Sequence, residues 1–386
     1  MNKNKVLLTI AVFLSFVIIF SFPMNIANAE SLQDNVQTQI GKIDFSEYEN
    51  FFNSLTENEG LDFITCLNNL LKGDYALEFD SIFKYFTSLI LSRVFDILPT
   101  IISVIAIAIL CGLIQQVRGS FLTEGVAEIT YFVCIMGIFI LLSSEIINII
   151  QNSRNVIDLI AKITEIMSPI MITLMVSIGA NVSASIYTPT VAFLSNGVIT
   201  AVNNFILPLV GVITVVNIVS NFSNAVKLNE LSNLFASIIK WTFGIIATVY
   251  GLFLSVQGIA SGIFDGISIK TAKYAISNTV PIVGGFIKDG FDLMIAGGVI
   301  IKNSIGIISI FLMLFVIVTP IVYLVVFSFL LKMASAIIEP ISDVRISHFC
   351  TSISKSIEYV VACVLLVGFM FFITVLLIIL SANSFV

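Results

Sequence analysis

Long apolar runs separated by short polar stretches dominate the sequence. A helix needs about 20 apolar residues to cross a bilayer, because each residue adds 1.5 Å and the hydrocarbon layer is roughly 30 Å thick. Five runs satisfy this requirement clearly, at residues 97–117, 126–150, 235–256, 305–331 and 357–380. The pattern therefore predicts an all-α, polytopic helical membrane protein, with a membrane domain at residues 96–386.

Three other regions leave the number of spans between about six and eight. Residues 166–178 form an apolar run that is too short to span, and residues 191–219 form a longer run that contains Pro208. Residues 280–301 are apolar but include glycines and charged residues. Broken helices at membrane depth are tolerated only where protein or a water-filled cavity surrounds the backbone. These regions therefore indicate either packed helix breaks or a polar path.

Composition excludes an ordinary soluble protein. Apolar residues make up 58% of the 386 residues and charged residues 11%, whereas about 25% of residues are charged in a typical soluble domain. The formal net charge is −6, but residues 30–80 alone hold 11 acids and two bases. An acidic segment thus precedes a nearly neutral apolar body, and no basic footprint for nucleic acid is present.

Residue types that catalysis or metal binding requires are scarce. The single histidine, His348, lies in a polar stretch, and the five cysteines have neither zinc-site nor CxxC spacing. The sequence contains no P-loop and no dinucleotide-binding glycine pattern. We therefore expect no catalytic, cofactor-binding or metal-binding residues, and a protein that is not an enzyme.

Residues 1–29 have the three parts of a signal peptide. Lys3 and Lys5 form a basic start, an apolar run follows, and Ala27 and Ala29 supply an A-x-A cleavage site. We predict cleavage after Ala29, and an uncleaved anchor helix is the alternative. In both cases the chain that follows emerges on the extracytosolic side.

Residues 30–95 form the acidic extracytosolic segment, and their apolar positions follow helical periodicity. Three amphipathic runs begin near Phe45, Leu61 and Phe79. For the third run, a helix on the membrane surface and a part in a small packed helical cap fit the pattern equally well. A segment of about 65 residues is a marginal domain by itself.

Small residues form a stripe in the region of the 235–256 run. Its members are spaced by three or four residues: Gly244, Thr248, Gly251, Ser255, Gly258, Gly262 and Gly266. At about 100° per residue they stay on one helix face. Small residues let helix backbones approach closely in lipid. We predict a tight helix–helix seam, inside the protein or between copies, with glycine-rich composition alone as the other explanation.

Ionisable residues gather between Asp265 and Lys302. Within this cluster, Lys288, Asp289 and Asp292 are candidates for a polar path, because the two aspartates are three residues apart and share a helix face. A surface loop with flanking lysines is the simpler explanation, and we favour it.

Asparagines are dense in the middle of the chain. They lie at Asn181, Asn196, Asn203, Asn204, Asn217, Asn221 and Asn224. Amide side chains on membrane helices often make interhelical hydrogen bonds. We expect that role for them more than the lining of a polar path.

Five motifs distributed over the chain carry a family resemblance. They lie at residues 187–197 (YTPTVAFLSNG), 254–258 (LSVQG), 265–273 (DGISIKTAK), 281–286 (PIVGGF) and 339–340 (EP). With the export signal and the acidic segment, they make the chain similar to the stage III sporulation protein AE family. These motifs have no assigned chemistry, so the resemblance supplies no site residues.

The resemblance implies a role in endospore formation. Members of this family are made in the mother cell. They reside as multi-pass proteins in the mother-cell-derived membrane around the forespore. The implied partners are the other stage III sporulation A-operon proteins, including an ATPase and ring-forming proteins, together with membrane lipid and a second copy of the chain. The resemblance implies an export platform or permease-like subunit of a mother-cell-to-forespore channel or secretion-like complex. A stand-alone solute permease is the alternative, suggested by the broken helices.

Overall fold

The computed structural model describes most of the chain after the predicted signal peptide. The described residues are 36, 38–41, 43–56, 62–72, 79–121, 124–222, 228–279 and 284–381. Only the helical backbone is described at residues 72, 79–83, 115–121, 124–127, 222, 256–264, 272, 276–279 and 284–288. The predicted signal peptide, residues 1–29, lies outside the described residues.

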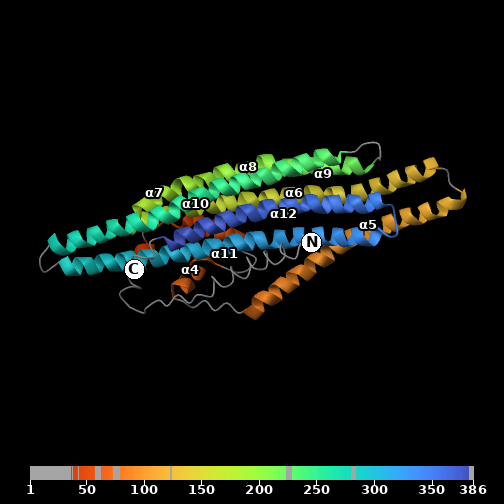
Figure 1. Cartoon of the computed structure of the whole chain (residues 1–386). Coiled ribbons are helices and arrows are strands. Elements are labelled where there is room, and N and C mark those ends of the chain that lie inside the picture. Colours follow the sequence, from red (N-terminus) through yellow and green to blue (C-terminus); the bar gives the residue numbers. More distant parts are fainter. Residues whose placement is uncertain are drawn as a thin grey trace.

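The regular structure of the described residues is helical throughout (Figure 1). Two short helices come first, α3 (Ser46–Thr56) and α4 (Phe63–Lys72). The long helices are α5 (Phe79–Phe121), α6 (Glu124–Ser177), α10 (Asn229–Thr279), α11 (Gly284–Ile338) and α12 (Val344–Leu380). Between α6 and α10 the chain follows one interrupted helical path, made of α7 (Asn181–Ala192), η2 (Phe193–Val198), α8 (Ile199–Ala201), η3 (Val202–Ile206) and α9 (Leu207–Phe222).

Six helical passages of the described chain are long and apolar enough to cross a membrane. They lie in α5, α6, the α7–α9 path, α10, α11 and α12. The prediction of an all-α, polytopic helical membrane protein is therefore confirmed. The number six is the lower end of the expected range.

Several helices are much longer than a bilayer is thick. Helix α6 has 54 residues, which at 1.5 Å each gives about 80 Å. The apolar runs 126–150 and 166–178 are two parts of this one helix, joined by a polar stretch. The run 191–219 lies on the α7–α9 path, and the described part of 280–301 begins α11. The three ambiguous regions therefore belong to elements that each pass the bundle once.

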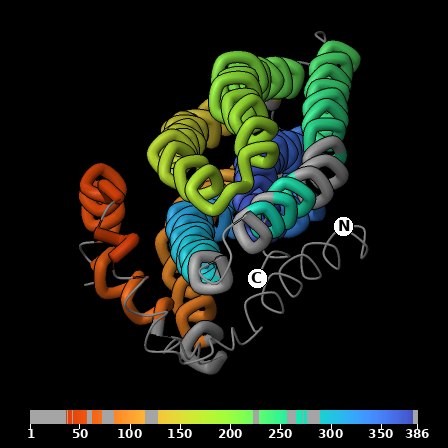
Figure 2. The backbone as a smooth tube through the Cα atoms, turned by 90° about the vertical axis from the view of Figure 1, so that its left-hand side faces the viewer, coloured from red at the N-terminus to blue at the C-terminus, as the bar shows by residue number. Residues whose placement is uncertain are grey.

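Helix α12 lies at the centre of the bundle (Figure 2). It packs against α11, α9 and α6, and 56% of its most apolar stretch is buried, against 17% for α10. Its core-facing residues include Phe349, Phe371 and Val364, all fully buried. Helix α10 lies at the outside, and the described residues leave most of its apolar stretch uncovered.

Helices α3 and α4 form a small cap on the bundle. Tyr48 and Phe52 of α3 meet Phe63 of α4 edge to face, with ring centroids 5.1 and 5.9 Å apart. The Tyr48 hydroxyl lies 2.8 Å from Ser309 Oγ of α11, and both groups are buried. The first two amphipathic runs are thus packed on the bundle, and the surface alternative for the third run remains a prediction.

The third amphipathic run of the acidic segment does not form a short helix of its own. It begins α5, which continues without a break through residue 95, the expected end of the segment. Tyr85, Leu91 and Phe95 are exposed along this part of α5. Helix α5 thus joins the acidic segment directly to the membrane domain.

Candidate functional site

The α7–α9 path is a helix interrupted at two places. In η2 and η3 the backbone bonds reach five residues back, as Ile199 N–H donates to Leu194 O and Leu207 N–H donates to Val202 O. Pro208 is the second residue after η3, directly following Leu207. Such π-turns widen the helix and occur frequently at functional sites.

Asn203, in the second π-turn, is held by two side chains of α6. Its Nδ2 donates to Asp158 Oδ1 at 2.5 Å. Its carbonyl oxygen accepts from Arg154 Nη2 at 3.1 Å. Because Asn203 is only 7% exposed, α6 fixes both its side chain and its backbone inside the bundle. Asn203 thus makes an interhelical hydrogen bond of the kind expected for these asparagines.

This cluster retains unused hydrogen-bonding capacity. Arg154 Nε and Asn203 Oδ1 are buried, and neither has a hydrogen-bond partner among the described residues. Unpaired buried polar atoms are costly and rare, and they accompany functional strain or an additional binding partner. Arg154 is half-buried and Asp158 is exposed, so Asn203 is the deeply buried member of the cluster. We therefore take Arg154, Asp158 and Asn203 as the candidate functional site.

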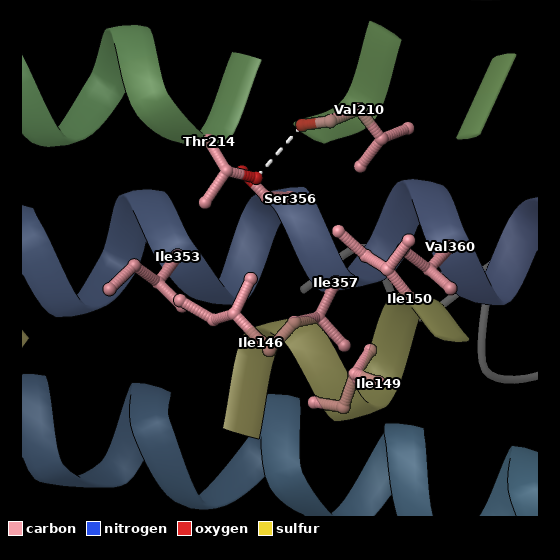
Figure 3. A pocket seen from close by; sticks show the side chains of 9 residues that line it. All are labelled: Ile146, Ile149, Ile150, Val210, Thr214, Ile353, Ser356, Ile357 and Val360. Atoms are coloured by element: carbon pink, nitrogen blue, oxygen red, sulfur yellow. Dashed lines mark hydrogen bonds between the residues drawn. The ribbon is translucent and has the colours of Figure 1, made fainter. Parts of the chain in front are cut away.

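A small hollow lies between α6, α9 and α12, and one of its lining residues, Ile150, is one helical turn before Arg154 (Figure 3). Isoleucines line most of it, namely Ile146, Ile149, Ile150, Ile353 and Ile357. The hydroxyl of Thr214 at its edge donates to Val210 O of its own helix at 2.8 Å. The cavity volume of about 10 Å³ is room for about one water molecule. The hollow is therefore a packing defect and too small for a solute.

The predicted small-residue stripe lies on the outer face of α10. Gly244, Thr248 and Ser255 are exposed. A Cβ atom added at Gly244 or Gly251 would meet nothing within 4 Å. Among the described residues this part of the stripe therefore packs against no other helix, and the seam remains a prediction. The surroundings of Gly258 and Gly262 lie outside the described residues, and Gly266 is half-buried.

The closely packed pair of helices within the chain is α11 and α12. Hydroxyl groups join them, with Ser328 Oγ 2.8 Å from Ser354 Oγ and Ser335 Oγ 2.8 Å from Ser347 Oγ. These serines were not among the residues predicted from the sequence. A signal was present, because both serine pairs, 328 with 335 and 347 with 354, have the seven-residue spacing that places residues on one helix face.

The three polar-path candidates lie near the start of α11, whereas the Asn203 site is formed by α6 and the second π-turn. Asp289 is exposed near the start of α11, whereas Asp292 forms an ion pair with Lys273 of α10. The side chain of Lys288 lies outside the described residues. Asp292 thus connects two helices, and a polar path through these residues remains a prediction.

Two buried charged residues at the ends of the Asp265–Lys302 cluster form hydrogen bonds with the ends of other helices. The Asp265 carboxylate of α10 accepts the backbone amides of Val182 and Ser183 at 2.9 and 3.0 Å. Lys302 of α11, fully buried, donates to Ile379 O at 3.1 Å and to Ser381 O, at the end of α12. Helix N-termini favour anions and C-termini favour cations. Each charge therefore satisfies backbone groups that the helix itself leaves free.

The fold and these buried charges define the chain as a polytopic membrane bundle whose polar groups join its helices. Comparison with known proteins adds the family. A model of the family described as stage III sporulation protein AE matches residues 61–382, and the chain belongs to this family. It is also 27% identical over 281 residues to the stage III sporulation protein AE of Bacillus subtilis (strain 168), which covers 73% of this chain and 70% of that protein. No solved structure matches the chain.

The family membership confirms the resemblance seen in the sequence and gives the chain a role in sporulation. The matched region begins before α4 and extends past α12. It therefore includes the Asn203 site, the α10 stripe and the α11–α12 contact. The family description names no ligand for any of them.

Proposed function

We propose that the chain is an integral membrane subunit of a channel or secretion-like complex between mother cell and forespore. In this proposal it is not an enzyme but an export platform or permease-like subunit in the membrane around the forespore. Its partners are the other proteins of the stage III sporulation A operon, including the ATPase and the ring-forming proteins. Membership of the sporulation family supports this role.

The outer face of α10 is the observation that carries the proposal. Between Gly244 and Ser255 it presents small residues, and the described part of the chain covers little of it. Helices in lipid associate through close packing, because lipid tails are as apolar as the side chains. An uncovered small-residue face of this length suits a partner helix. A subunit of an assembly needs such a face, and a self-sufficient transporter does not.

A stand-alone solute permease is the second candidate function, and the Asn203 site favours it. Transporters place interrupted helices and polar groups at the middle of the bundle. The interrupted α7–α9 path beside Arg154 and Asp158 has this character. The apolar hollow next to it offers no room for a solute, which makes this function the weaker proposal.

Affinity purification of the full-length chain from sporulating cells tests the leading proposal. The wild-type chain is expected to retain the ATPase and the ring-forming proteins, and Gly251→Leu to lose them. Gly290→Leu is the matched control. A Cβ at Gly290 also meets nothing within 4 Å, but Gly290 belongs to α11 and not to the α10 stripe. Equal recovery with all three chains contradicts the proposal. Solute uptake by proteoliposomes holding the chain alone would favour the permease.

A further inference from the structure

The carbonyl oxygen of Asn203 lacks a backbone donor because of the local sequence. In the π-turn, an amide bonds to the carbonyl five residues earlier, and Leu207 N–H accordingly donates to Val202 O. The next amide in this register would come from residue 208 and would reach Asn203 O. Residue 208 is a proline, which has no N–H group. Leu207, the donor that a regular α-helix would use, is already engaged.

Arg154 supplies the missing donor from another helix. Its Nη2 lies 3.1 Å from Asn203 O. Asn203 is buried there, with only 7% of its surface exposed. A buried carbonyl without a donor is unfavourable, since the water bond it loses is not replaced. The guanidinium therefore stabilises the π-turn by making a bond that the backbone cannot make.

Asp158 strengthens this contact from the same face of α6. It lies four residues after Arg154, one helical turn along, and accepts from Asn203 Nδ2 at 2.5 Å. One face of α6 thus binds both polar ends of a single residue. Release of Arg154 would leave the carbonyl to find water or to change its helical register.

We propose that Arg154 is a positioning residue that replaces the amide absent from Pro208. Its contact with Asn203 is a latch that holds the α7–α9 path in its interrupted form. While the latch is closed, α7 and α9 keep a fixed offset. When it opens, the helix can re-form its bonds in another register, and α9 moves relative to α7. The unpaired Arg154 Nε and Asn203 Oδ1 are the groups left for bonds in that second arrangement.

The latch concerns a conformational step inside the chain and holds independently of the channel proposal. Its test uses the full-length chain in detergent, with hydrogen–deuterium exchange of peptides from residues 199–210 as the direct measurement. Arg154→Met removes the donor and is expected to raise exchange there by about tenfold or more. Arg154→Gln keeps a neutral donor and should exchange nearly as the wild type does.

A second-site change distinguishes the latch from an ordinary ion pair. Pro208→Ala restores a backbone amide at the missing position, so Arg154→Met with Pro208→Ala is expected to recover most of the lost protection. If Arg154 acts only as a charge partner of Asp158, then Arg154→Met with Asp158→Asn should recover it instead. That second outcome overturns the proposal, as does unchanged exchange in Arg154→Met.

Two further measurements guard against misfolding. Exchange in α11–α12 peptides should remain as in the wild type, because the latch does not touch that helix pair; a general rise there with Arg154→Gln as well as Arg154→Met overturns a local role. Heat-resistant spore counts should fall with Arg154→Met and recover with the added Pro208→Ala. Loss of co-purified partners alone would bear on the channel proposal and leave the exchange result intact.

Discussion

The carboxylate of Asp265 accepts the backbone amide of Ser183 at 3.0 Å, so that α10 caps the first turn of α7. The residue at the start of α7, Ala180, has no side chain able to do so. Just before it, Gly179 with φ of 85° lets the chain turn back from α6. The α6–α7 connection is therefore held by a residue more than 80 positions away.

Asp265→Ala is expected to destabilise the chain by about 2–4 kcal/mol, because two amides are left without a charged acceptor. Thermal unfolding of the purified chain in detergent measures the change. Asp265→Asn retains an acceptor and should cost less. Asp289→Asn is the control, since Asp289 is exposed and should change stability little. Equal unfolding temperatures for Asp265→Ala and this control would contradict the capping role.

Two glycines that look alike in sequence should respond in opposite ways to alanine. A Cβ at Gly112 of α5 would collide with the carbonyl oxygen of Ile341 and lie 3.0 Å from its carbonyl carbon. Because neither backbone can give way cheaply, we expect Gly112→Ala to cost about 1–3 kcal/mol. Gly251→Ala meets open space and should stabilise α10 by up to about 1 kcal/mol through helix propensity. Thermal unfolding of the two variants side by side checks both signs.

Acid should weaken the start of α12. Asp343 accepts Arg345 N–H at 2.9 Å and pairs with its guanidinium at 2.8 Å. Burial opposes ionisation of Asp343, but the hydrogen bonds from Arg345 outweigh it and hold the pKa of this carboxyl below its usual range. Its stabilisation is therefore complete above the unfolded pKa of about 4 and is lost as the pH falls through the lower, folded value.

Comparison with Asp343→Asn isolates this effect. The variant is expected to be less stable than the wild type by about 0.5–1 kcal/mol at pH 7, because the partly exposed ion pair is lost while the cap remains. The difference should shrink on acidification below about pH 4. Thermal unfolding at both pH values measures it. A difference that stays constant would show that the ionised carboxylate is unimportant.

The α3–α4 pair is expected to be held to the bundle by the Tyr48 hydroxyl. Ser309 Oγ donates to Ile305 O at 2.8 Å, so it accepts from Tyr48. Tyr48→Phe should cost about 1 kcal/mol and speed proteolysis between α3 and α4, measured by limited digestion. Tyr85→Phe is the control, because Tyr85 is 48% exposed. Identical digestion rates for the two variants would count against this attachment.

The lengths of the apolar runs were sufficient to predict the helical bundle, since only helices satisfy the backbone over such runs. They could not predict that the short run 166–178 continues α6, because the polar stretch before it resembles a loop. Asn203 was correctly expected to bond to a neighbouring helix. Its dependence on Arg154 could not be predicted, because it requires knowing that the helix is a π-turn at that residue.

The spacing of small residues marked an uncovered helix face in one place and a packed contact in another. In α10 it marked the Gly244–Ser255 face, which the described part of the chain leaves uncovered. In α11 and α12 the same kind of spacing, Ser328 with Ser335 and Ser347 with Ser354, marked a packed contact. Spacing identifies which residues share a face of one helix. What covers that face depends on residues far along the chain, which a local pattern does not contain.

The two hydroxyls on the outer face of α10 donate hydrogen bonds to carbonyl oxygens of their own helix. Thr248 donates to Gly244 O at 2.7 Å and Ser255 donates to Gly251 O at 2.8 Å. A chain that docks there therefore meets a nearly smooth carbon surface, and its fit depends on shape without directional bonds. Close packing against small residues would therefore hold a docked chain there, and neither hydroxyl would fix its position along the helix axis.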